Sequence, residues 1–310
     1  MISRIELDQM QSLPLRLKII KTVARIGEWY DAHDGMIYVS FSGGIDSTVL
    51  ADITRRLYPV VPLVFANTGN ELPEILSFVN TFSNVVQVRP KHGMRWVFET
   101  HGYPVVNKSV SKSLSRYRTA KDDVQRELRK WGGINPTSGK VQRMGVIPKR
   151  WHFLIDAPFK ISDKCCEYLK KGPMDRYDRD SGRSAMTGEM AADSNDRRVA
   201  YLQRGCNYFG THHKSTPMGF WTRQDVLEYL VEFKIPYCNL YGDIIRDNTA
   251  GLLETTGEQR TGCWCCFFGC HMEPHPNRFE RMKITHPKHY DVCINKLGGG
   301  KVLDFMGVVY

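Results

Sequence analysis

The chain has 310 residues and a hydrophobic content of 42%, so it can bury a full core, which excludes a disordered protein. Its 43 lysines and arginines outnumber 33 aspartates and glutamates, and the resulting net charge of +10 favours anionic partners such as nucleotides or nucleic acid. The charged first residues and the lack of any apolar run of about 18 residues predict no signal peptide and no membrane span. We therefore expect a cytoplasmic protein that does not act on a membrane.

The first predicted element is a helix within an N-terminal helical segment, residues 1–34. Apolar side chains recur at helical spacing between about Leu13 and Ala32, and Ser12 and Pro14 are typical helix start signals. The pattern predicts an amphipathic helix that packs against the core of the domain that follows.

A short β-rich apolar run, residues 37–41, breaks into Ser42-Gly43-Gly44 and restarts as a helix. The glycines permit positive φ and close backbone approach, and the N–H groups that open the helix would face an anion. Ser42 and Ser47 add hydroxyl donors. Because the run lacks the lysine of a Walker-type loop, it predicts a different phosphate-binding loop; the alternative is an ordinary glycine-rich turn.

Strands and helices alternate after this loop. The sequence predicts a helix to about Leu57, a strand over residues 60–66, a helix over 73–82 and a strand over 85–88. This alternation predicts an α/β fold with a doubly wound, mainly parallel sheet. Asn67 and Thr68 follow the second strand, and ligands bind at the carboxyl ends of such strands, so we expect both residues near the phosphate loop.

The alternation lapses between residues 107 and 150, where twelve cations face three acids. With Tyr117 and Trp131 interleaved, the stretch from Arg116 to Lys130 could follow a phosphate backbone and stack a base of tRNA or DNA. The alternative interpretation is a solvated helix face. The segment is therefore a candidate nucleic-acid contact.

Two adjacent cysteines, Cys165 and Cys166, open the second half of the chain on a predicted short helix. Gly172-Pro173 should end this helix, because proline lacks the N–H that a continuing helix needs. A strand is predicted at residues 184–188, before a polar turn.

The last predicted helix of the α/β alternation begins at Thr222, an N-cap with Asp225 as its capping partner. The remaining residues, 261–310, form a Cys-rich C-terminal extension. Within it we expect the glycine run at residues 297–300 to be flexible.

Two sequence motifs carry a family resemblance. Ser-Gly-Gly-x-Asp-Ser over residues 42–47 resembles the PP-loop of the ATP pyrophosphatase superfamily. Cys-Cys-x-x-x-Lys-x-x-Pro from Cys165, with the turn from Gly188 to Arg197, resembles the phosphoadenosine phosphosulfate reductase family, although Met190 stands where that family usually has arginine. The resemblance covers about residues 35–269 and implies an adenine nucleotide alpha hydrolase-like fold.

The resemblance also implies an active site and a division of the chain. ATP and Mg²⁺ would bind at the loop, with Asp46 as a candidate ligand of the metal. The implied nucleotide-binding residues are Ser42, Gly43, Gly44, Asp46, Ser47, Asn67, Thr68 and Gly188, and the implied catalytic residues are Asp46, Ser47, Asp193 and Arg197. The nucleotide-binding domain would span residues 35–260, with the basic segment as an insertion at about 107–150.

Four cysteines resemble the [4Fe–4S] ligand set of adenylylsulfate reductases: Cys165, Cys166, Cys263 and Cys266. Clustered cysteines in a reducing compartment favour metal over disulfides. Zinc is the alternative, although its ligand pairs normally have about two to four intervening residues, which disfavours adjacent cysteines. Cys265, Cys270 and His271 are substitute ligands, and Cys206, Cys238 and Cys293 are interpreted as small buried hydrophobes.

The resemblance implies an ATP pyrophosphatase that adenylates its substrate, after which a sulfur nucleophile displaces AMP. Together with the basic segment, it predicts sulfur transfer to nucleic acid, of the tRNA thiolation or DNA phosphorothioation type, with a sulfur donor such as a cysteine desulfurase. The first alternative is a sulfonucleotide reductase, against which the absence of a Glu-Cys-Gly-x-His tail counts. The second is a non-enzymatic, zinc-stapled nucleic-acid-binding module.

Overall fold

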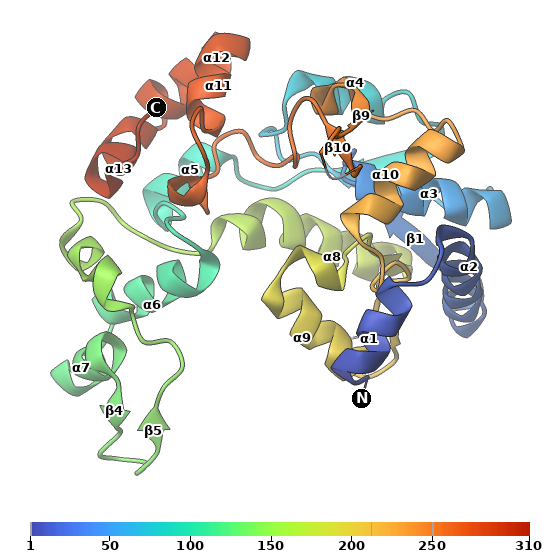
Figure 1. Ribbon diagram of the computed structural model, residues 1–310. Coiled ribbons are helices and arrows are strands. Elements are labelled where there is room, and N and C mark those ends of the chain that lie inside the picture. Colours follow the sequence, from blue (N-terminus) through green and yellow to red (C-terminus); the bar gives the residue numbers. More distant parts are fainter. Residues whose placement is uncertain (1, 212, 250) are drawn as a thin grey trace. The chain divides into compact units, whose positions relative to one another are not determined.

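The computed structural model describes residues 2–211, 213–249 and 251–310 (Figure 1). Met1, which begins the predicted N-terminal segment, and His212 and Ala250 of the predicted α/β domain lie outside the described residues. Two compact units are present. Unit 1 comprises the residues up to Asn67, Glu71–Arg89 and Pro173–Thr261, and unit 2 comprises Thr68–Asn70, Pro90–Gly172 and Gly262–Tyr310.

Unit 1 is built on a six-stranded sheet in the order β3-β2-β1-β6-β8-β7. Its strands are β1 (Ile37–Ser40), β2 (Leu63–Ala66), β3 (Val85–Val88), β6 (Ser184–Met186), β7 (Asn207–Tyr208) and β8 (Lys214–Ser215). The neighbouring pairs from β3 to β8 are parallel, and β7 runs antiparallel to β8. The predicted α/β class with a doubly wound, mainly parallel sheet is confirmed.

The strand order places a switch point beside β1. The chain builds outward from β1 through β2 to β3, then returns to β6 on the opposite side of β1 and continues to β8. In a doubly wound sheet, ligands bind outside the carboxyl ends of the strands at this point, because the loops there diverge and leave a crevice. The loops that follow β1 and β6 lie at this switch point.

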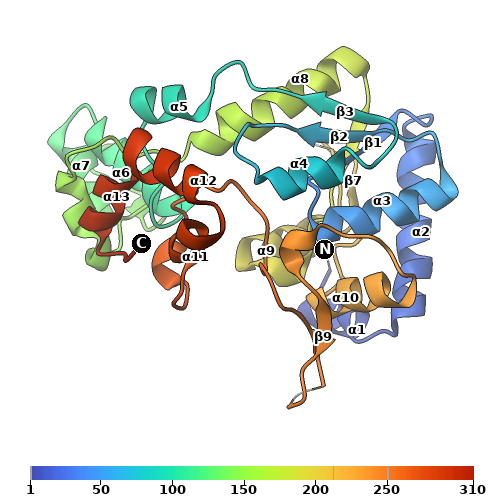
Figure 2. The ribbon, with the colours of Figure 1, turned by 90° about the horizontal axis from the view of Figure 1, so that it is seen from above.

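Helices cover both faces of this sheet (Figure 2). The helices of unit 1 are α1 (Arg4–Gln11), α2 (Leu15–Ala32), α3 (Ile45–Leu57), α4 (Pro73–Val79), α8 (Gly172–Ser181), α9 (Asn195–Arg204), α10 (Arg223–Glu232), η3 (Ala191–Asp193) and η4 (Asn239–Tyr241). Helix α8 belongs to unit 1 from its second residue, Pro173, onward. Ile37 and Val39 pack in the core with Val49 of α3. Tyr38 faces the other way and donates a hydrogen bond of 2.5 Å to Asp178 of α8. Both faces of β1 are therefore buried, which explains its continuous apolar sequence.

The predicted cap of α10 is confirmed. The Thr222 side chain accepts from the N–H of Asp225, and the Asp225 carboxylate accepts from the N–H of Thr222 at 2.6 Å. The same carboxylate pairs with the buried Lys18 of α2 at 2.6 Å. One aspartate therefore caps α10 and joins it to α2. A short hairpin, β9 (Ile244–Arg246) and β10 (Leu253–Thr255), follows α10.

Unit 2 has a separate, mainly helical core. Its elements are α5 (Met94–Thr100), α6 (Lys108–Arg118), α7 (Asp123–Trp131), β4 (Gly133–Ile134), β5 (Val141–Gln142), η1 (Lys149–Asp156), η2 (Glu167–Lys171), η5 (Cys270–Met272), α11 (Arg278–Thr285), α12 (Pro287–Asp291), η6 (Val292–Lys296) and α13 (Gly299–Met306). Leu114 and Leu154 share this core with Phe267, Phe279 and Leu303. The basic segment and the Cys-rich extension thus belong to one unit, because they bury their apolar side chains together.

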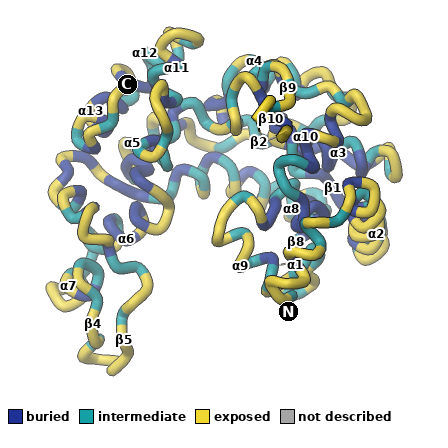
Figure 3. Tube along the Cα trace, viewed as in Figure 1, coloured by how far each residue is buried: buried dark blue, intermediate teal, exposed yellow. Residues whose placement is uncertain are grey.

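Exposure within unit 2 is uneven (Figure 3). The antiparallel hairpin of β4 and β5 is drawn largely as exposed, whereas α6 carries a buried face that includes Val110 and Leu114. No helix in the described part of the chain has the length and apolar character needed to cross a membrane.

Two local expectations are wrong. Gly172-Pro173 does not end a helix, since α8 starts at Gly172 directly after η2. The π-type turn of η2, in which the N–H of Gly172 bonds to the carbonyl of Glu167, accommodates a proline that cannot donate. The glycine run is also structured: Gly299 and Gly300 begin α13 and are buried. A Cβ at Gly299 would lie 2.6 Å from the Cys293 carbonyl oxygen, so packing selects glycine there.

Candidate nucleotide site and cysteine cluster

The loop between β1 and α3 is closed by its own hydroxyl groups. Ser47 Oγ accepts from the Ser42 N–H at 3.1 Å and donates to the Gly44 carbonyl at 2.8 Å. The two serine Oγ atoms are 3.1 Å apart. Gly43 has φ 72°, a left-handed conformation that favours glycine, and Gly44 is the N-cap of α3. The predicted loop thus leads directly into a helix N-terminus, where backbone N–H groups favour an anion.

The glycines around this loop differ in what surrounds them. A Cβ at Gly44 would lie 3.1–3.3 Å from hydroxyl oxygens of Thr261, Tyr241 and Ser42, which are side-chain ends. A Cβ at Gly188 would lie 3.0 Å from the backbone carbonyl carbon and oxygen of Asp46, which cannot easily move aside. Gly188, two residues after β6, therefore packs closely against the backbone of the first turn of α3. Its predicted contact with a nucleotide stays a prediction.

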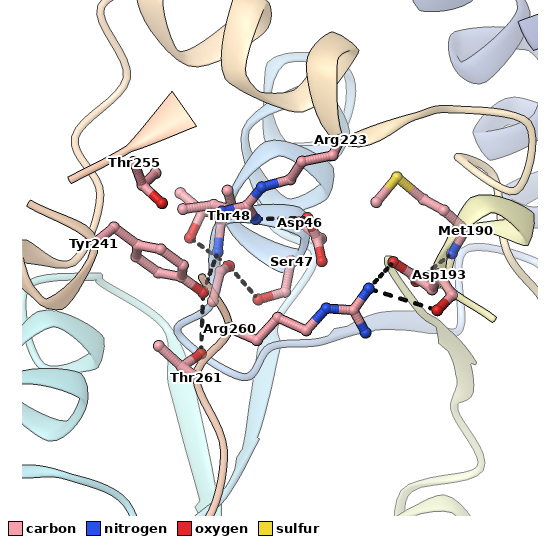
Figure 4. Close-up of polar contacts among 12 residues, drawn as sticks. Asp46, Ser47, Thr48, Met190, Asp193, Arg223, Tyr241, Thr255, Arg260 and Thr261 are labelled. Atoms are coloured by element: carbon pink, nitrogen blue, oxygen red, sulfur yellow. Dashed lines mark hydrogen bonds and ion pairs between the residues drawn. The ribbon is translucent and has the colours of Figure 1, made fainter. Parts of the chain in front are cut away.

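Asp46 lies at the centre of a charged group on the first turn of α3 (Figure 4). Its Oδ1 atom is 3.9 Å from Arg223 Nη1. Within the described residues, Asp46 Oδ1 and Arg223 Nη2 are buried without a hydrogen-bond partner. Unsatisfied buried polar atoms cost free energy, so both atoms are poised to bind an incoming group. The carboxylate suits a cation and the guanidinium suits a phosphate.

The pKa of Asp46 is raised to about 6. Burial is the largest cause, since it disfavours the charged carboxylate, and the neighbouring Asp193 adds like-charge repulsion. Arg223, Arg260 and Arg197 act in the opposite direction. A divalent cation between the two carboxylates would relieve both unfavourable effects.

Asp193 supplies the second carboxylate of the site. Its carboxylate accepts from the Met190 N–H at 3.1 Å, pairs with Arg197, and lies 3.4 Å from Arg260 Nη2. Met190 is buried in the core of unit 1, so it brings no charge to the site. Figure 4 shows Arg260 extending toward Asp193. The predicted residues Asp46, Ser47, Asp193 and Arg197 therefore surround one region of unit 1.

Four residues of this site were missed by sequence reasoning. Tyr241 Oη accepts from the Ile45 N–H at 3.4 Å and lies 3.1 Å from Thr261 Oγ1, at the start of α3. Arg223 is the first residue of α10, and Arg260 directly precedes Thr261. The Thr222 cap predicted that Arg223 begins a helix, but nothing in the sequence indicated that this helix starts close to the loop of residues 42–47.

The two residues after β2 are placed differently. Asn67 belongs to unit 1, and its side chain donates to Gln87 of β3 at 3.0 Å. Thr68 belongs to unit 2, where its Oγ1 accepts from the Asn70 N–H at 3.1 Å. Their predicted contact with a nucleotide stays a prediction.

The four predicted metal ligands, Cys165, Cys166, Cys263 and Cys266, all belong to unit 2. Cys165 donates to the Cys166 sulfur at 4.0 Å, and this contact raises the pKa of Cys165 and lowers that of Cys166 to about 6. The thiols of Cys266 and Cys263 also raise the pKa of Cys165, so their charges are coupled. Among the described residues, no three His, Cys, Asp or Glu side chains form a ready metal-binding group. By donor chemistry the four thiols suit iron–sulfur or zinc, and the metal assignment stays a prediction.

Cations flank these thiols. Lys108, Lys170 and Lys171 lower the pKa of Cys166, and Arg278 opposes the increase that burial causes in the pKa of Cys266. Arg278 Nη1 also donates to the Cys266 carbonyl at 3.0 Å, while its Nε donates to Glu273 at 2.7 Å. The guanidinium thus holds the backbone of the loop from Cys263 to Cys266, the Cys-x-x-Cys loop, and stabilises negative charge on the Cys266 sulfur.

A doubly wound sheet with a serine- and glycine-rich loop at its switch point is an arrangement typical of nucleotide-binding α/β proteins. The model of the phosphoadenosine phosphosulfate reductase domain matches residues 36–268, so the chain belongs to this enzyme family. An adenosine 5'-phosphosulfate reductase from Deinococcus radiodurans is 27% identical over 106 residues, which are 34% of this chain and 35% of that protein. The match thus spans about a third of that relative's length.

One solved structure is also similar. It is the crystal structure of phosphoadenylyl-sulfate (PAPS) reductase from Candida auris in a phosphate complex, with a TM-score of 0.39 at 14% identity. The match covers 77% of this chain and 91% of that chain.

Proposed function

We propose that the protein is an ATP pyrophosphatase that activates its substrate by adenylation and serves sulfur transfer to nucleic acid. The observation that carries the proposal is that two buried atoms beside the loop of residues 42–47 lack a hydrogen-bond partner: Asp46 Oδ1 and Arg223 Nη2. A carboxylate for a metal and a guanidinium for a phosphate, set at a helix N-terminus, match the charges of ATP with Mg²⁺.

The residues divide the work by position. The N–H groups at the start of α3 and the hydroxyls of Ser42 and Ser47 would hold the pyrophosphate that leaves. Asp46 would hold Mg²⁺, which supplies neutralisation of the phosphate charge when bound. Arg223 and Arg260 would contact phosphate oxygens, because guanidinium groups match their geometry. The protein thereby contributes positioning and charge stabilisation to adenylyl transfer.

A nucleic-acid acceptor is supported by the cations that remain exposed in unit 2. Arg116, Lys140 and Arg143 are exposed, and Lys130 Nζ lies 5.2 Å from the centroid of the exposed Trp131 ring. Arg118 is different, since its guanidinium donates to the carbonyls of residues 154, 155, 157 and 159. It therefore serves the fold, and the surface available to a phosphate backbone is smaller than the count of cations suggests.

A sulfonucleotide reductase is the second candidate, and the Deinococcus radiodurans relative favours it. Reduction of a sulfonucleotide needs an accessible cysteine to attack the sulfate sulfur. Cys293 is fully buried, so its thiol cannot reach the sulfate group of a bound sulfonucleotide.

The test is product analysis with anaerobically purified protein. ATP and Mg²⁺ are supplied with tRNA or DNA and a persulfide donor in one reaction, and a sulfonucleotide with a thiol reductant in another. We expect AMP and pyrophosphate from the first and no sulfite from the second. Asp46→Asn should abolish the ATP reaction, while Asp8→Asn, an exposed change on α1, should leave it intact. Sulfite without AMP or pyrophosphate would instead establish the reductase.

A further inference from the structure

Two cysteines outside the predicted metal set form a close pair in the core of unit 2. Cys265 Sγ lies 2.8 Å from Cys293 Sγ, and both side chains are fully buried. Cys265 lies between the predicted ligands Cys263 and Cys266, and Cys293 lies in η6. The pair therefore joins the Cys-x-x-Cys loop to the helices of the C-terminal extension.

The distance between the two sulfur atoms separates this pair from two ligands of one zinc ion. Two thiolates on one tetrahedral zinc, with Zn–S bonds of about 2.3 Å, lie about 3.8 Å apart. Cys165 and Cys166, at 4.0 Å, are close to that spacing, whereas 2.8 Å is too short for it. A disulfide needs about 2.05 Å, so a movement of less than about 1 Å would bring the Cys265 and Cys293 sulfurs to bonding distance.

The surrounding packing holds the two cysteines in place. Cys293 lies against Gly299, where a Cβ would meet the Cys293 carbonyl oxygen at 2.6 Å and the Phe267 ring at 2.8 Å. Phe267 follows Cys265 by two residues and is also fully buried. Neither segment can move far without disturbing the core, so the two thiols remain neighbours.

We propose that Cys265 and Cys293 are a modification site at which peroxide forms a disulfide. One sulfur attacks a peroxide oxygen, giving a sulfenic acid and one water, and the other sulfur then displaces the second water as the S–S bond forms. Two thiols and one hydrogen peroxide thus give one disulfide and two waters. The bond links the loop that carries Cys263 and Cys266 to η6, and thiol reductants reverse it.

The test is peptide mapping of the full-length protein. Protein reduced and freed of reductant is treated with hydrogen peroxide or buffer, quenched in acid, denatured and alkylated without reduction. Fragment-ion mass spectrometry should then locate an S–S bond between Cys265 and Cys293 in the peroxide sample, and dithiothreitol should remove it. Alkylation of both cysteines after peroxide treatment would overturn the proposal, and this measurement needs no variant.

Matched variants decide which cysteine of the crowded loop reacts. Cys265→Ala should abolish the link to Cys293, whereas Cys270→Ala, which removes a buried cysteine of the same segment, should retain it. Persistence of the Cys293 link in Cys265→Ala would overturn the assignment. Because the readout is a covalent bond, it does not depend on enzymatic activity.

Discussion

The two units hold their reactive side chains, the hydroxyls of unit 1 and the thiols of unit 2, in different ways. In unit 1, a backbone turn between β1 and α3 holds the hydroxyls, and tertiary packing brings Arg223 and Arg260 to it. In unit 2, the thiols lie inside a hydrophobic core, where helices and aromatic rings hold them. The comparison indicates that substitutions which crowd the backbone should affect the loop of unit 1 most. Substitutions that remove a single side chain should affect the thiols of unit 2 most.

The largest expected effect is on unit 1. Gly188→Val should weaken ATP binding by at least about a hundredfold, because its side chain would push into the backbone of Asp46. Gly44→Ala, which meets movable hydroxyl groups, should weaken it less than about tenfold. Gly27→Ala in α2, where a Cβ meets one atom at an ordinary 3.6 Å, is the control. Titration calorimetry measures all three, and unchanged affinity in a folded Gly188→Val variant would contradict the site.

The next expected effect is on the thiols of unit 2. Anaerobic purification should give brown protein with roughly four irons per chain. Cys263→Ser should lose this iron, while Cys238→Ser in unit 1 should keep it. Iron and zinc are measured by mass spectrometry of the metals. Stoichiometric zinc without iron after reconstitution would exclude the cluster and leave the same cysteines as the candidate metal site.

Arg118 separates fold from function within the basic segment. Arg118→Ala should lower the free energy of unfolding by about 2 kcal/mol, because partly buried carbonyl groups in η1 and directly after it lose their donor. Denaturant unfolding measures the loss. A variant as stable as the parent would show that water replaces the guanidinium at those carbonyls.

The exposed Arg116 and the half-buried Lys130 of the same segment should act on binding instead. Arg116→Ala and Lys130→Ala should each weaken binding to tRNA or DNA and reduce the salt slope by about 1, since each removes one phosphate contact. Arg4→Ala, an exposed change in α1, is the control. Binding that is absent, or insensitive to salt, would leave the segment as solvated surface.

The smallest expected effect is a change in stability at Asp46, whose charged carboxylate destabilises the folded protein but would bind Mg²⁺. Its folded-state pKa of about 6 lies above the ordinary value of 3.8, so the folded protein loses stability as pH rises from about 4 to about 6. Above about pH 6 the loss of stability is complete. Asp46→Asn should therefore stabilise the ligand-free protein at pH 8, on the order of 1 kcal/mol, since the side chain is 35% exposed and solvent reduces the effect.

Thermal unfolding at pH 4 and pH 8 measures this difference. At pH 4 the parent and Asp46→Asn should unfold at nearly the same temperature, because the carboxyl group is then largely protonated in the folded state. The variant should also lose Mg²⁺-dependent ATP binding. A variant that is less stable than the parent at pH 8 would contradict the raised pKa.

The sequence by itself determined the local features of this protein. The apolar run ending in Ser42-Gly43-Gly44, the alternation of strands and helices, and the Thr222 cap predicted the sheet class, the phosphate loop and the start of α10. These features depend on short-range geometry: positive φ at glycine, the period of apolar residues and hydrogen bonds within one turn.

Only the tertiary structure decided which distant groups meet. Arg223 and Asp46 are 177 positions apart, and their approach depends on how α3 and α10 pack on the sheet. The same holds for Cys265 and Cys293, which sequence reasoning treated separately, and for Gly299, where packing overrides the flexibility of a glycine run. A core specifies such pairs through the combined shape of many side chains, and no local pattern records that shape.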